Sequence, residues 1–201
     1  MPIPNPVESL ELLARYRVPA HVVAHSQRVA QIGVLLAADL AAAGVALSVD
    51  LVEAGGLLHD IAKMIAMEDG GNHAVRGEDL LAKLGYPEVG RLVGQHILLT
   101  DWQPGEDPNE AALVFYADKR VRHEEVVSLA DRFVDLMARY GRTPEIRQRL
   151  DRMNQHTFAL EETIFSRLSY PPERLNDLNR EPLPGLARAG ILASGPLLAG
   201  R

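Results

Sequence analysis

Apolar residues recur along most of this chain at intervals of three and four, which is the period of an amphipathic helix. The stretch 125–140 is typical, because Val126, Leu129, Phe133 and Leu136 fall on one helical face. Alternating apolar and polar positions, the pattern of a half-buried strand, are nearly absent. We therefore expect an all-α protein.

Capping and breaking residues divide this pattern into helices. Asn5 followed by Pro6 is typical of an N-cap with proline at the first helical position, and Gly44 is typical of a helix end. The clearest loop is TDWQPGEDPN at 100–109. The predicted helices span about 6–17, 19–43, 49 or 51–68, 72–84, 87–99, 109–123, 125–140 and 144–168.

The predicted helices form one domain over residues 1–169, with its core at about 20–135. From Tyr170 onward the composition changes, because nine of the 32 residues at 170–201 are proline or glycine. This pattern favours an extended or flexible C-terminal tail over a tail that binds a partner.

Composition narrows the functional classes. Of the 201 residues, 47% are hydrophobic and 24% charged, as in ordinary globular proteins. The net charge of −6 argues against a broad surface for nucleic acid or anionic membrane, but a small phosphate ligand needs only local positive charge. The absence of cysteine excludes disulfides and thiolate metal sites. We expect a cytoplasmic protein, since the sequence shows no secretory signal and no apolar run of about 18 residues.

The segment GGLLHDIAK at 55–63 places His59 and Asp60 within an apolar helical pattern. An ionised carboxylate in such surroundings is costly unless it is paired or coordinates a cation. Adjacent residues on a helix point about 100° apart, so both reach one ion only if it lies between their directions. Gly55 and Gly56 lack side chains, and the helix that carries His25 is expected to approach closely there.

Histidines and aspartates with ligand chemistry fall on several predicted helices. The candidate metal ligands are His25, His59, Asp60, His73, His96 and Asp118. The first ion would be held by His25, His59, Asp60 and Asp118, and a bridging Asp60 would let His73 and His96 hold a second. Nitrogen and oxygen ligands without sulfur suit iron, manganese, cobalt, magnesium or zinc, so one or two divalent ions are expected.

Three cations lie one helical turn from these candidate ligands. Lys63 follows His59 by four residues, Arg28 follows His25 by three, and Arg122 follows Asp118 by four. Each is either a substrate-binding group for phosphate or an ordinary helix-surface cation. The expected catalytic residues are Asp60, as the bridging carboxylate, and Lys63.

Other residues leave alternatives open. His21 lies four residues before His25, so it is either a further ligand, an orienting group or a partly buried histidine. Asp101 and Trp102, in the loop after His96, would either contact substrate or anchor the turn. His123 and His156 are interpreted as structural or exposed.

Five segments occur in the order found in HD-domain metal-dependent phosphohydrolases: HSQRVA at 25–30, GLLHDIAK at 56–63, HAVRG at 73–77, QH at 95–96 and YADK at 116–119. The chain resembles that superfamily over roughly residues 20–135. The resemblance implies a helical domain around one or two metal ions and hydrolysis of phosphoesters or nucleotide anhydrides. The additional histidines are similar to those of the dinuclear branch that includes the symmetrical diadenosine tetraphosphate hydrolases.

The sequence departs from the usual motifs in two places. Ala62 replaces the common glycine of the HDIGK form, and Ile97-Leu98-Leu99 follow His96 where the diadenosine branch has threonine and a nearby glycine. The second departure bears on the dinucleotide substrate more than on the metal chemistry.

The leading hypothesis is a phosphohydrolase that acts on a small nucleotide or related phosphoester through a metal-activated hydroxide. One alternative is an HD sensor module that binds metal and nucleotide with little turnover. The other is a metal-free helical interaction protein. We expect no broad nucleic-acid surface and no membrane partner, and a homodimer stays open.

Overall fold

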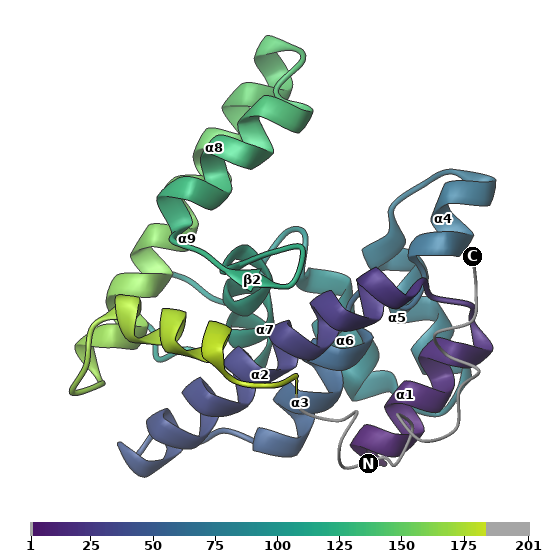
Figure 1. The fold of residues 1–201 in the computed structure, drawn as a ribbon, viewed down its shortest axis with the longest axis horizontal. Coiled ribbons are helices and arrows are strands. Elements are labelled where there is room, and N and C mark those ends of the chain that lie inside the picture. Colours follow the sequence, from purple (N-terminus) through teal and green to yellow (C-terminus); the bar gives the residue numbers. More distant parts are fainter. Residues whose placement is uncertain (1, 184–201) are drawn as a thin grey trace.

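The computed structural model describes residues 2–183, whose regular secondary structure is helical apart from one two-stranded hairpin (Figure 1). This confirms the predicted fold class. No helix in the described range combines the length and the apolar content required to cross a membrane. The elements are α1 (Pro6–Arg15), α2 (Ala20–Ala42), α3 (Val49–Leu58), α4 (Lys63–Asp69), α5 (His73–Lys83), α6 (Pro87–Gln95), α7 (Glu110–Lys119), β1 (Val121–Arg122), β2 (Glu125–Val126), α8 (Leu129–Tyr140), α9 (Pro144–Ser166) and the 3-10 helix η1 (Pro172–Arg180).

Helix α3 is enclosed by α2, α6 and α7, and two glycines make this packing possible (Figure 1). A Cβ atom on Gly56 would lie 2.7 Å from the Cα atom of Ala30 in α2. A Cβ atom on Gly55 would lie 3.0 Å from side-chain atoms of Leu92 in α6 and Val114 in α7. The expected close approach of the helix that carries His25 is therefore present at Gly56.

Helices α3 and α6 end earlier than the sequence predicts, and a candidate ligand directly follows each of them. Helix α3 ends at Leu58, and residues 59–62 form a turn instead of continuing the helix to 68. In this turn the amide of Ile61 donates to the carbonyl of Leu58, three residues back. Helix α6 likewise ends at Gln95 instead of Leu99. His59 and His96 are the residues that immediately follow these helices.

The hairpin β1–β2 lies where the sequence predicts the end of one helix and the start of the next. Val121 pairs with Val126 and Arg122 with Glu125, so His123 and Glu124 form the turn. His123 has φ of +58°, a conformation unfavourable for residues with a side chain. Tertiary contacts to this turn, described below, override the helical propensity of the segment.

Helices α8 and α9 lie side by side and project from the rest of the protein (Figure 1). Leu136 and Leu150 are buried between them, and further along α9 Leu160 and Ile164 are fully buried. This hairpin of helices extends away from the region where α2, α3 and α7 meet.

The segment after residue 170 differs from the predicted tail over its described part. Residues 172–180 form η1, whose Leu175 and Leu178 are buried. In Figure 1, η1 (yellow) crosses beside α2. The prediction of an extended or flexible tail also covers residues 184–201, which lie outside the described residues.

Candidate metal centre

All six predicted metal ligands lie in two adjoining groups. His25, His59 and Asp118 form one, and Asp60, His73 and His96 form the other. Within each group, one ligand atom from each residue lies within 4.8 Å of the others. The residues come from α2, α5, α7 and the ends of α3 and α6, so tertiary packing brings them together.

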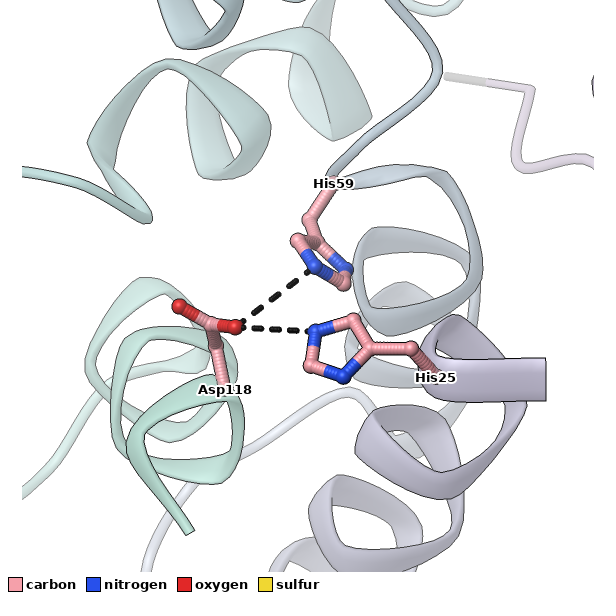
Figure 2. Close-up of side chains that lie close together, drawn as sticks. All are labelled: His25, His59 and Asp118. Atoms are coloured by element: carbon pink, nitrogen blue, oxygen red, sulfur yellow. Dashed lines mark hydrogen bonds and ion pairs between the residues drawn. The ribbon is translucent and has the colours of Figure 1, made fainter. Parts of the chain in front are cut away.

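In the first group, one oxygen of Asp118 faces two histidines (Figure 2). Asp118 Oδ1 lies 3.1 Å from His25 Nε2 and 3.7 Å from His59 Nε2. The rings of His25 and His59 meet edge to face with centroids 5.2 Å apart. Three ligand atoms thus converge on one point from α2, α7 and the end of α3.

Asp60 lies between the two groups. Its Oδ1 is 3.0 Å from His73 Nε2 and 3.9 Å from His96 Nε2, whereas its Oδ2 is 3.6 Å from His59 Nε2. One carboxylate oxygen therefore faces each group, as a bridging ligand requires. Lys63 Nζ lies 2.7 Å from Oδ2 on the more exposed side.

Three of the histidines share one orientation. Their Nδ1 atoms lie 2.7 to 2.8 Å from backbone carbonyls: His25 to His123, His59 to Gly56 and His96 to Val93. Because a carbonyl only accepts, Nδ1 must donate its hydrogen. In the neutral ring Nε2 then carries the lone pair, which is the arrangement typical of metal-binding histidines.

The Nε2 atom of His59 is buried and has no hydrogen-bond partner. It faces carboxylate oxygens of Asp60 and Asp118, and a lone pair directed at two anions is unfavourable. A cation between these three groups would satisfy all of them. The residues present therefore fit a divalent metal ion with nitrogen and oxygen ligands.

Burial keeps two of these histidines neutral. It lowers the pKa of His59, and with the neighbouring His59 it lowers the pKa of His96 to about 3. Both rings are therefore unprotonated near neutral pH, which is the state that binds metal.

The two aspartates are held ionised. Burial raises the pKa of Asp60, but the hydrogen bond from His73 and the positive charge of Lys63 oppose it, and the pKa lies well below its ordinary value. Burial likewise opposes ionisation of Asp118, and the charge of Lys119 is the main effect that holds its pKa well below the ordinary value.

We expect the chelator-treated protein to lose stability as pH falls from 6.5 toward 3. Over this range His96 gains a proton in the unfolded chain but not in the folded one, so unfolding takes up protons and acid favours it. The lowered pKa values of His59, Asp60 and Asp118 act in the same direction at their own pH ranges. Urea midpoints measured across this range should fall less steeply for His96→Asn. The exposed His21→Asn is the matched control and should keep the wild-type slope.

Lys119 lies in the centre, although the sequence pattern did not identify it as a functional residue. Its Nζ lies 2.6 Å from Asp118 Oδ2 and 2.9 Å from the carbonyl of His96, and the side chain is buried. It thus connects a residue of each group. The sequence feature that could have identified Lys119 is its position: it is a second charged residue, directly after Asp118, in an otherwise apolar helix.

The three predicted substrate-binding cations lie in different surroundings. Lys63 lies beside Asp60 with 40% of its side chain exposed. The guanidinium of Arg28 is directed instead at backbone carbonyls, including Glu124 and Glu181. Arg122 forms an ion pair with Glu125 across the hairpin. The structure therefore brings only Lys63 of these three into contact with the ligand groups.

The structure also shows the surroundings of His21, Asp101 and Trp102, whose roles the sequence did not decide. His21 is exposed and belongs to neither ligand group. Trp102 is fully buried and donates to the carbonyl of Glu106, and Asp101 accepts from Gln95, which favours the turn-anchor interpretation.

Comparison with known proteins agrees with this geometry. Residues 22–134 match the HD domain family. Ribonuclease Y from Desulfotalea psychrophila is 38% identical over 95 residues, and ribonuclease Y from Fervidobacterium nodosum is 36% identical over 118 residues. These alignments cover 45% and 55% of this chain but 17% and 21% of the relatives, so the chain spans only a small part of their length. No solved structure matches.

Proposed function

Since the chain belongs to the HD domain family of metal-dependent phosphohydrolases, we propose that it hydrolyses a phosphoester or phosphoanhydride bond in a small nucleotide or related compound. The observation that carries this proposal is the buried, unpartnered Nε2 of His59, which faces the carboxylates of Asp60 and Asp118. A lone pair that faces two carboxylates is unfavourable, and a divalent cation between the three groups would satisfy all of them.

The two groups would hold one ion each. His25, His59 and Asp118 would bind one, His73 and His96 the other, and Asp60 would contribute one oxygen to each. When bound, divalent ions in such a site supply Lewis acidity and an activated water nucleophile.

The chain's own cations have different roles in this proposal. Lys63 is partly exposed beside Asp60, so its ammonium group is available to a phosphoryl oxygen of the substrate. Lys119 is buried and occupies the second oxygen of Asp118, which leaves Oδ1 directed at His25 and His59. We therefore place Lys63 against the substrate and Lys119 behind the ligands.

The substrate class has a second candidate. Both curated relatives are named as ribonucleases, which favours an RNA phosphodiester as the alternative to a small nucleotide. A sensor module that binds metal and nucleotide without turnover is the alternative to an enzyme, and the same ligand residues would serve it.

The test is to purify the protein without chelators and to measure bound metal per chain together with hydrolysis. The panel contains nucleoside di- and triphosphates, dinucleoside polyphosphates, a phosphomonoester and a short RNA. About two ions per chain with turnover of a nucleotide is the expected result.

Each other outcome is informative. Hydrolysis of RNA alone would show that the substrate is an RNA phosphodiester and not a small nucleotide. A nucleotide that raises thermal stability without being hydrolysed would favour the sensor module. A protein that binds no ion after reconstitution with iron, manganese or cobalt would refute the proposal.

A further inference from the structure

His25 differs from the other two oriented histidines in the origin of its carbonyl partner. His59 and His96 each donate to a carbonyl three residues earlier, in the helix that ends directly before them. His25 donates to the carbonyl of His123, which is 98 residues away in the sequence. The orientation of His25 therefore depends on where the β1–β2 turn is held.

Helix α2 contacts both residues of that turn. One turn of helix after His25, Arg28 Nε donates to the carbonyl of Glu124 at 3.1 Å. The φ of +58° at His123 shows that the turn has an unfavourable backbone conformation, which surrounding contacts must maintain. Arg28 is one of those contacts.

The 3-10 helix η1 contacts strand β2, which directly follows this turn. Asn179 accepts from the amide of Val126 at 2.7 Å and donates to its carbonyl at 3.0 Å. The guanidinium of Arg28 donates to the carbonyls of Leu178 and Glu181 near the end of η1. Arg28 is only 6% exposed. Its guanidinium is hydrogen-bonded to these carbonyls, whereas the sequence had suggested that it binds a phosphate group of the substrate.

We propose that Arg28 and Asn179 are positioning residues, which fix the β1–β2 turn so that its carbonyl directs His25 Nε2 at the first ion. Both act through His25 and neither contacts the substrate. Asn179 lies outside residues 22–134, so a segment beyond the family match completes the centre. This inference rests on the metal centre of the proposed function. It adds that binding of the first ion depends on Arg28 and Asn179.

The test measures Co²⁺ affinity by isothermal titration in two backgrounds of the full chain. His96→Ala impairs the second group and reports the ion at His25, whereas His25→Ala reports the ion at His73 and His96. We expect Arg28→Met to weaken binding about tenfold or more in the first background and less than about threefold in the second. A general loss of stability would affect both backgrounds alike.

Two matched variants accompany this test. Arg174→Met removes an exposed arginine of η1 that pairs with Asp177, and it should leave both affinities unchanged. His123→Gly keeps the carbonyl and suits the positive φ, so it should also retain both affinities. If Arg28→Met fails to fold, Asn179→Ala decides the question with the same expected selectivity.

Equal weakening in both backgrounds, or none, would overturn the inference. These outcomes differ from failure of the proposed function. A wild-type protein that binds two Co²⁺ ions but hydrolyses nothing would refute the activity, while the selective affinity change would still support the positioning role.

Discussion

Replacing Asp60 with alanine should remove both metal ions and all measurable hydrolysis together. Its Oδ1 faces His73 and His96, whereas its Oδ2 faces His59, so one substitution takes a ligand from each group. It also leaves the buried Nε2 of His59 without one of its two facing carboxylates. We expect affinity for both ions to fall at least about 100-fold and turnover to drop below about 1% of wild type.

Metal content by elemental analysis and hydrolysis of the best substrate would check this result. Asp69→Ala is the matched control, because Asp69 is a partly exposed residue of α4 that pairs with Arg76. It should retain both ions and full activity. Retention of one ion by Asp60→Ala would contradict the bridging role, and retained activity would exclude Asp60 from the centre.

The sequence predicted the elements of this site better than their local geometry. The apolar spacing and the caps at Asn5 and Gly44 specify helices, and both features are local in the chain. The six candidate ligands were recognisable because His and Asp residues in apolar surroundings are costly without a partner. Their assembly into two groups, however, depends on contacts between distant helices.

The ends of helices were the least predictable feature of the site. Apolar residues continue past His59 and past His96, so periodicity extends both helices by several residues. The structure places the consecutive residues His59 and Asp60 in neighbouring groups, with His59 Nε2 3.6 Å from Asp60 Oδ2.

Arg28 shows a further limit of sequence reasoning. Its spacing from His25 predicts a cation near the metal centre, and the structure does place it one turn away. The carbonyls that occupy it come from the β1–β2 turn and from η1, far along the chain. Spacing along a helix indicates on which face of the helix a residue lies. It does not indicate which residues from distant parts of the chain that residue will contact.

Replacing Gly56 with alanine should destabilise the protein and weaken the first ion. The added Cβ would lie 2.7 Å from the Cα and 3.0 Å from the N atom of Ala30, so the backbones of α2 and α3 must separate. The expected cost is about 1–3 kcal/mol, typical of overpacking, despite a gain in helix propensity of about 1 kcal/mol. Because His25 lies on α2 and His59 directly follows α3, their separation would also change, and Co²⁺ affinity at the first group should fall.

Gly55→Ala is the matched control for this effect. It gains the same helix propensity in the same helix, but its Cβ would meet side-chain atoms of Leu92 and Val114 at 3.0 Å instead of backbone. Side chains adjust by a few tenths of an ångström at lower cost than two packed helices, so Gly55→Ala should be the more stable variant in urea unfolding. Its Co²⁺ affinity should remain near that of wild type. Equal stability and equal affinity for the two variants would show that the contact at Ala30 does not set the spacing of His25 and His59.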